Sequence, residues 1–215
     1  MAWQAPHETY YQPQGENVMG LIFGSYRIMN YELRMRMKWE IVSSIYLSKR
    51  QYFTARKDKC ETPDGKIIEE YFVVELPPSA CAVAITETGE ILMVRQYRHP
   101  IGETILELPG GFVDENEDHD MAMQRELKEE TGYEFSSIIL LGKVAANPGV
   151  LNNFTYLFLA QGGVKTAAQK LDKNEELTVE KISLETLKTL FLENKIVQSL
   201  HANCIFYALR RLKML

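Results

Sequence analysis

The chain has 215 residues, of which 46% are hydrophobic and 25% are charged. This length and balance are typical of a globular protein with one good-sized domain, or one domain and a smaller attachment, whose core needs no disulfide staples. The formal net charge of −5 argues against nucleic-acid or membrane partners, because those usually require a basic surface.

The cysteines and the apolar runs point to a cytoplasmic protein. Cys60, Cys81 and Cys204 are widely spaced and form no CxxC pair, so neither a disulfide framework nor a zinc site is expected. The early apolar run at residues 18–23 is too short to span a bilayer and lacks the features of a signal peptide.

The first part of the chain is expected to hold an arm and a small β-domain. Residues 1–39 form the arm, in which residues 26–39 have a spacing that allows a helix. Residues 40–78 carry three runs rich in β-branched and aromatic residues, with a turn at Thr62-Pro63-Asp64-Gly65, and predict an antiparallel sheet. We place the domain boundary after Pro77-Pro78, because paired prolines cannot continue a strand ladder.

Residues 79–215 predict an α/β (α+β) domain in which a mixed sheet is covered by helices. Helices are expected over residues 121–130, from Ser183 as N-cap, and from about Ser199. Asp118 is a plausible N-cap and Gly132 a plausible left-handed C-cap of the first helix. Strands are expected at residues 80–86, 91–96, 105–108, 138–144, 154–160 and 177–182.

The first of these helices concentrates negative charge. Glu126, Glu129 and Glu130 stand at i, i+3 and i+4, which places three carboxylates on one helix face. Most such runs are solvated surface, but like charges this close disfavour a helix unless a cation lies among them. Mg²⁺ prefers carboxylate oxygen and leaves room for water and phosphates. Arg125, one turn before Glu129, can hold that carboxylate in place.

The stretch from Gly111 to Tyr133 resembles the Nudix box at every specified position, with Glu117, then Arg125-Glu126-Leu127, Glu129-Glu130 and Gly132 at the family's spacing. The resemblance implies an α/β/α sandwich for residues 79–215 and hydrolysis of a phosphoanhydride. It also implies Mg²⁺ or Mn²⁺ bound by Glu126, Glu129, Glu130 and the backbone carbonyl of Gly110.

The flanking sequence looks like the ADP-ribose pyrophosphatase branch of the family, through residues 92–100, residues 106–111 and Pro148. In that branch the arginine matching Arg98 lies near the substrate phosphates, although surface charge is the plain alternative. The loop at residues 172–179 resembles the one that carries the general base. Glu175 aligns best, and Glu176 is the alternative register.

The branch also has an N-terminal β-domain that pairs two subunits and helps to hold the adenine, and residues 40–75 look like it. Tyr52, Phe53 and Arg56 could stack on the base or meet phosphate there, or could be core or dimer contacts.

The sequence therefore predicts a homodimeric, metal-dependent enzyme that splits ADP-ribose into AMP and ribose 5-phosphate, with Arg125 and Glu129 serving catalysis. Another nucleoside diphosphate sugar, such as GDP-mannose, is the alternative substrate. A non-catalytic ligand-binding protein on a Nudix scaffold is a third possibility.

Overall fold

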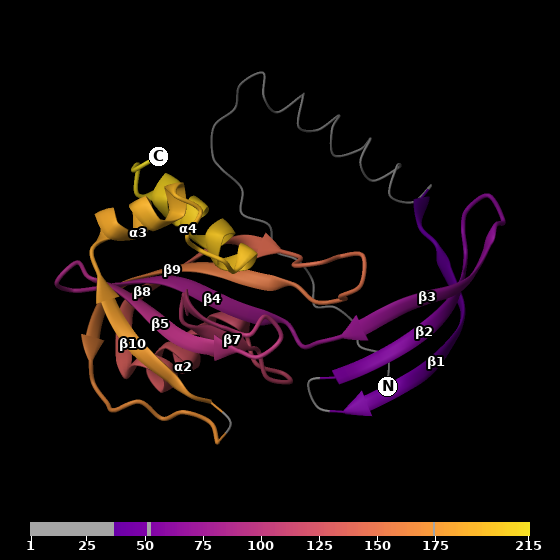
Figure 1. Ribbon diagram of the computed structural model, residues 1–215, viewed down its shortest axis with the longest axis horizontal. Helices are drawn as coiled ribbons and strands as arrows, with labels where there is room; N and C mark the ends of the chain where they lie inside the picture. Colours follow the sequence, from indigo (N-terminus) through magenta and orange to yellow (C-terminus); the bar gives the residue numbers. More distant parts are fainter. Residues whose placement is uncertain (1–36, 51–52, 174) are drawn as a thin grey trace. The chain divides into compact units, whose positions relative to one another are not determined.

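A computed structural model describes residues 37–50, 53–173 and 175–215 (Figure 1). The chain divides into two compact units. Among the described residues, residues 37–44 and 58–71 form one unit, and the others form the second unit. Most of the helix considered for residues 26–39 lies outside the described residues.

A three-stranded antiparallel sheet contains β1 (Glu40–Arg50), β2 (Phe53–Glu61) and β3 (Ile67–Glu75), in the order β1-β2-β3. The predicted turn between β2 and β3 is present, with the Gly65 N–H donating to the Thr62 carbonyl at 2.9 Å. Alternate side chains of a strand lie on one face of the sheet, and on β1 three of these, Ile41, Ile45 and Leu47, are 57–59% exposed in this chain.

The larger sheet has seven strands and mixed pairing. Its main order is β10-β5-β4-β9-β8, with β6 beside β5 and β7 beside β4. The pair β4 and β9 is parallel, and the other registered pairs are antiparallel. The strands are β4 (Ser79–Thr86), β5 (Ile91–Arg98), β6 (Glu103–Glu107), β7 (Gly110–Phe112), β8 (Tyr133–Val144), β9 (Thr155–Lys165) and β10 (Leu177–Ile182).

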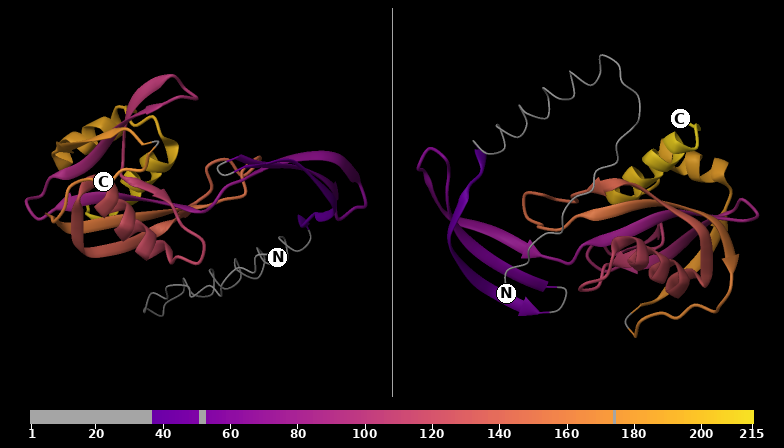
Figure 2. Two further views of the ribbon diagram at one scale, coloured as in Figure 1. Left: turned by 90° about the horizontal axis from the view of Figure 1, so that it is seen from below. Right: turned by 180° about the vertical axis from the view of Figure 1, so that it is seen from behind.

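Helices cover both faces of this sheet: α2 (His119–Thr131) lies on one face, and α3 (Leu184–Leu192) and α4 (Ser199–Arg211) lie on the other (Figure 1, Figure 2). The central strand β4 shows why. Ala80, Ala82 and Ala84 pack with the α2 face, whereas Cys81 and Val83 pack with α3 and α4. Side chains alternate between faces along a strand, so β4 supplies both cores. The predicted mixed sheet covered by helices, with a small antiparallel sheet before it, is confirmed.

The helix ends follow the predicted caps with one difference. Gly132 ends α2 in the left-handed conformation at φ 76°, and Ser183 caps α3 by accepting from the Thr186 N–H at 3.0 Å. Asp118 occupies the N-cap position of α2, but its side chain makes no capping hydrogen bond.

Cys60, Cys81 and Cys204 are buried, and no disulfide joins them to one another. None of the helices within the described residues is long and apolar enough to cross a membrane.

Candidate functional site

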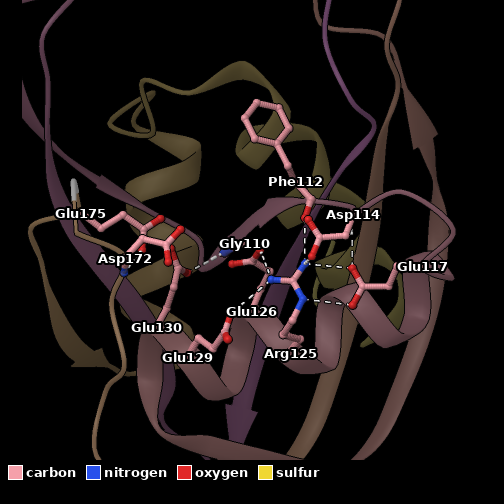
Figure 3. Close-up of polar contacts among 10 residues, drawn as sticks. All are labelled: Gly110, Phe112, Asp114, Glu117, Arg125, Glu126, Glu129, Glu130, Asp172 and Glu175. Atoms are coloured by element: carbon pink, nitrogen blue, oxygen red, sulfur yellow. Dashed lines mark hydrogen bonds and ion pairs between the residues drawn. The ribbon is translucent and has the colours of Figure 1, made fainter. Parts of the chain in front are cut away.

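The acidic face of α2 meets the turn between β6 and β7, and Arg125 is the organising side chain (Figure 3). Its Nε and Nη2 atoms donate to the two carboxylate oxygens of Glu117 at 3.0 and 2.9 Å. Its Nη1 atom donates to Glu126 Oε1 at 2.7 Å and to Glu129 Oε2 at 3.2 Å. The expected contact with Glu129 is present, and one guanidinium also holds Glu117 and Glu126.

Arg125 also ties the helix to the sheet, because its Nη2 donates to the Phe112 carbonyl in β7 at 3.0 Å. The bond to Arg125 holds the pKa of Glu117 below its ordinary value, and Glu117 raises the pKa of Arg125 in turn. Glu117 is therefore a stable anchor in the loop before α2.

The pKa values of two glutamates of the helix, Glu126 and Glu130, are shifted upward, which is opposite to the shift at Glu117. Burial raises the pKa of Glu126 to about 6, although Arg125 opposes the shift. Burial raises the pKa of Glu130 to about 8, against the hydrogen bond from Gly110. The charges of Glu129 and Glu175 add to the increase at Glu126, and those of Glu126 and Glu175 add to it at Glu130. A site that disfavours its own negative charges in this way favours a cation.

Two glycines let the backbone approach these carboxylates. The Gly110 N–H donates to Glu130 Oε2 at 2.8 Å. Gly110 has φ 153°, and a Cβ on it would collide with the Ala80 carbonyl oxygen. A Cβ on Gly111 would lie 2.6 Å from the Glu126 carboxyl group. The glycine pair therefore leaves room for Glu126 and Glu130 beside the turn.

The donor set fits a hard divalent cation. The three glutamates of α2 and the carbonyl of Gly110 offer only oxygen, which Mg²⁺ and Mn²⁺ accept. In the structure their oxygens face Arg125 and the Gly110 N–H, and among the described residues no three His, Cys, Asp or Glu side chains are arranged as a ready ligand group. Binding an ion at the predicted ligands would therefore require some of these carboxylates to turn.

Arg98 ends β5 and donates from Nε to Glu107 Oε2 at 2.7 Å. Its side chain is 44% exposed. Its positive charge opposes the increase in the pKa of Glu130, so Arg98 lies near enough to act on that carboxyl group. The role of Arg98 as a phosphate contact stays a prediction.

The two base candidates lie in the loop before β10. Glu175 stabilises its own turn, because its N–H donates to the Asp172 carbonyl at 2.9 Å and its carboxylate accepts from the Asp172 N–H at 3.1 Å. Its charge acts on both Glu126 and Glu130, and its side chain lies near Glu130 (Figure 3). Glu175 and Glu176 are both exposed. Because the charge of Glu175 acts on the helix carboxyl groups, Glu175 remains the first candidate for the base and Glu176 the alternative.

Phe53, Arg56 and Pro148 come from elements other than those that carry the cluster. Phe53 and Arg56 lie on β2, where Phe53 is 57% exposed and Arg56 forms an ion pair with Glu75. Tyr52 lies outside the described residues. Pro148 is exposed in the loop between β8 and β9, within a turn in which the Asn147 carbonyl accepts from Val150 and Leu151.

The sequence assigned no role to Glu107 or His201. Glu107 is completely buried, and His201 of α4 lies beside it, with Nδ1 at 3.9 Å from Glu107 Oε1. In the sequence, Glu107 could have been noticed as a charged residue directly before Leu108-Pro109-Gly110. His201 joins the site through α4, which no local pattern reveals.

Comparison with known proteins gives two adjacent family matches. The model of the NUDIX domain matches residues 75–201. The model of the nucleoside diphosphate sugar hydrolase N-terminal domain matches residues 39–74.

Individual proteins agree with these matches. The chain is 29% identical over 167 residues to an ADP-ribose pyrophosphatase of Bacillus subtilis (strain 168), across 75% of this chain and 90% of the relative. It is 33% identical over 143 residues to a methanol dehydrogenase activator of Bacillus methanolicus, across 66% and 77% respectively. A crystal structure of an ADP compounds hydrolase has the same fold, with a TM-score of 0.72 at 21% identity over 82% of this chain and 95% of that one. Since the NUDIX domain model spans more than half of the chain and includes the acidic helix and its glycine turn, the chain belongs to the Nudix hydrolase family.

Proposed function

We propose that the enzyme hydrolyses the diphosphate linkage of ADP-ribose to AMP and ribose 5-phosphate. The observation that carries the proposal is the cluster of Glu126 and Glu129, held by Arg125, with Glu130, held by the Gly110 N–H, beside the Gly110-Gly111 turn. Its raised carboxyl pKa values favour a bound cation, and a cation suits an anionic diphosphate. Relatives named ADP-ribose pyrophosphatase support the choice of substrate.

The three glutamates and the Gly110 carbonyl would hold Mg²⁺ or Mn²⁺. When bound, the ion lowers the pKa of coordinated water and offsets negative charge on the diphosphate. Arg125 orients Glu126 and Glu129 and links them to Glu117. The role of Arg125 is thus to set carboxylate geometry, while Glu129, at the exposed edge of the cluster, is the ligand nearest to solvent.

Arg98 and Glu175 would act on the substrate and on the water. Arg98 binds phosphate oxygens through N–H groups that Glu107 does not use. Glu175, or Glu176 in the alternative register, takes a proton from the attacking water. The water oxygen forms a new P–O bond, the bond between phosphorus and the bridging oxygen breaks, and the bridging oxygen leaves with the other product.

A related sugar nucleotide, such as GDP-mannose, is the second candidate substrate. The match of residues 39–74 to a nucleoside diphosphate sugar hydrolase N-terminal domain supports this wider class. In this proposal Phe53 and Arg56, together with Tyr52, help to hold the base.

The protein acts as a homodimer in this proposal, with the small sheet at the interface. Edge strand β1 carries Ile41, Ile45 and Leu47 on one face, all more than half exposed in the single chain. Natural proteins rarely leave an apolar edge strand uncovered, because it promotes pairing with other chains. The free cysteines accord with a cytoplasmic location.

A product assay tests the proposal. ADP-ribose, GDP-mannose, NADH and nucleoside triphosphates are incubated with Mg²⁺, with Mn²⁺ and with a chelator, and the products are separated. We expect AMP and ribose 5-phosphate from ADP-ribose with metal, and no turnover in chelator. Failure to cleave any dinucleotide or sugar diphosphate with metal present would reject the proposal.

A further inference from the structure

Glu107 is a completely buried acid at the end of β6. Its Oε2 atom accepts from Arg98 Nε at 2.7 Å. A buried carboxylate disfavours folding unless it is paired and hydrogen-bonded, so the partner of Glu107 offsets the cost of burying its charge. Arg98 is that partner, and its own side chain remains 44% exposed.

The neighbouring histidine, His201, does not form a hydrogen bond with the second carboxylate oxygen of Glu107. Glu107 Oε1 has no hydrogen-bond partner among the described residues, and His201 Nδ1 is 3.9 Å away. That nitrogen accepts from the Leu108 N–H at 3.2 Å, so it carries no proton. Burial, followed by the charge of Arg98, lowers the pKa of His201 to about 3, which leaves the ring neutral. Glu107 therefore pairs with Arg98 and not with a charged His201.

Arg98 lies on the α2 side of the sheet. Leu92 packs with the α2 core, and alternation along β5 places Arg98 on the same face. Its charge also lowers the proton affinity of Glu130, as described above. A guanidinium is planar, so a bond that fixes Nε also fixes the direction of the two terminal nitrogens.

We propose that Glu107 is a positioning residue, which holds the Arg98 guanidinium in the orientation that binds the substrate diphosphate. The inference rests on the proposed function, because it concerns the same site. Glu107 itself does not touch the substrate, since its side chain is completely buried. A preformed arginine binds an anion more tightly than a free one, because less side-chain entropy is lost on binding.

A double-mutant cycle on the full chain tests this role. The probe is an ADP-ribose analogue with a methylene group in place of the bridging oxygen, titrated by calorimetry with Mg²⁺ present. Glu107→Met keeps the side-chain length but removes the acceptor, and we expect it to weaken binding about tenfold. Glu107→Gln keeps an acceptor for Arg98 Nε and should restore part of the affinity. In an Arg98→Ala background, Glu107→Met should change affinity less than about twofold, because positioning acts through Arg98.

A matched control exists on the same strand. Arg95 pairs with Glu180 through Nε and through Nη2, the latter at 3.1 Å, and alternation places Arg95 on the opposite face from Arg98. Glu180→Gln should therefore leave the affinity for the analogue within about twofold of the wild-type value. Thermal unfolding of each variant checks that it is folded, and if Glu107→Met does not fold, the cycle is measured with Glu107→Leu, which also lacks the acceptor.

The outcomes separate this inference from the proposed function. Wild-type affinity in the Glu107 variant, or an equal loss with and without Arg98, overturns the positioning role. A protein that binds the analogue but does not hydrolyse ADP-ribose contradicts the proposed function, and the cycle still decides the role of Glu107. A wild-type protein that does not bind the analogue overturns both.

Discussion

At the scale of single residues, the site depends on how burial and one arginine divide the acidic side chains. Arg125 contacts Glu117, Glu126 and Glu129, whereas Glu130 is buried and bonded to the Gly110 N–H. The exposed fraction of the Glu129 side chain is 36%, against 12% for Glu126. Glutamates within one turn of the helix therefore differ in environment, and they should respond differently to substitution.

Glu129→Gln should lower kcat for ADP-ribose by about a hundredfold or more, because it removes a carboxylate from the proposed metal ligands. The partly exposed position predicts little change in Tm. Steady-state kinetics and thermal unfolding measure the two effects. Glu185→Gln, at an exposed position of α3, is the control and should match the wild type. Near-normal kcat in Glu129→Gln would contradict a ligand role.

Glu130 should make stability depend on pH when divalent metal is chelated. Its pKa is raised from 4.5 to about 8, so the folded protein retains a proton over a range in which the unfolded chain has lost it. The free energy of unfolding should therefore fall as the pH rises between these values, at up to about 1.4 kcal/mol per pH unit. Urea unfolding in chelator measures this, and Glu130→Gln should flatten the dependence. Equal slopes for the two proteins would exclude Glu130 as the cause.

Some of these features of single residues could be predicted from the sequence, and others could not. The spacing of Glu126, Glu129 and Glu130 predicted a shared face, and the contact between Arg125 and Glu129 followed from one helical turn. The environment of Glu130 could not be predicted, because it depends on the Gly110 turn and on the loop that carries Glu175. Glu107 and His201 meet only through packing of β6 against α4.

At the scale of elements, the turn between β6 and β7 fixes the backbone against α2. The strands and helices of the large sheet were predicted in the correct order, since their apolar runs are strong. The predicted start of β8 at residue 138 was wrong, because the strand begins at Tyr133. Residues 133–137 include Glu134 and Ser136 and resemble a loop locally, but they pair with distant residues of β9, such as Val164. The short strand β7 was also missed, because Gly110 and Gly111 indicate a turn.

The two glycines of this turn should fail in different ways. In Gly111→Ala the new Cβ meets the end of the flexible Glu126 side chain, which can move, so we expect a folded protein with kcat reduced about tenfold or more. In Gly110→Ala the Cβ meets backbone at Ala80 and the φ of 153° is unfavourable, so we expect about 2 kcal/mol or more of lost stability. Denaturant unfolding and kinetics on both variants test the contrast, which equal stability would refute.

At the scale of the whole molecule, we propose different roles for the two sheets, one in hydrolysis and the other in the association of chains. The seven-stranded sheet carries the carboxylate cluster on the α2 side, and the three-stranded sheet exposes apolar side chains of β1. Both sheets were predicted from strand patterns and from Pro77-Pro78. The association of chains was predicted only through family resemblance, because a sequence pattern shows which residues are apolar but not what covers them.

The apolar face of β1 predicts a dimer that one charge can disrupt. Ile45→Lys places a charge among Ile41 and Leu47, and burying an unpaired charge in an interface is costly. We expect light scattering after size exclusion to give a dimer mass for the wild type and a monomer mass for the variant. Glu40→Gln, at an exposed position that alternation places on the other face of the same strand, is the control. A monomeric wild type would contradict the proposed interface.

The central claim is that the cluster on α2 supports metal-dependent cleavage of a sugar nucleotide diphosphate. Phosphorus NMR of ADP-ribose with the wild-type protein tests it most directly, because diphosphate and phosphate monoester groups give distinct signals. With Mg²⁺ or Mn²⁺, we expect the diphosphate signals to be replaced by the signals of AMP and ribose 5-phosphate. Chelator or the Glu129→Gln substitution should prevent this change. Diphosphate signals that persist with the wild-type protein and metal would contradict it.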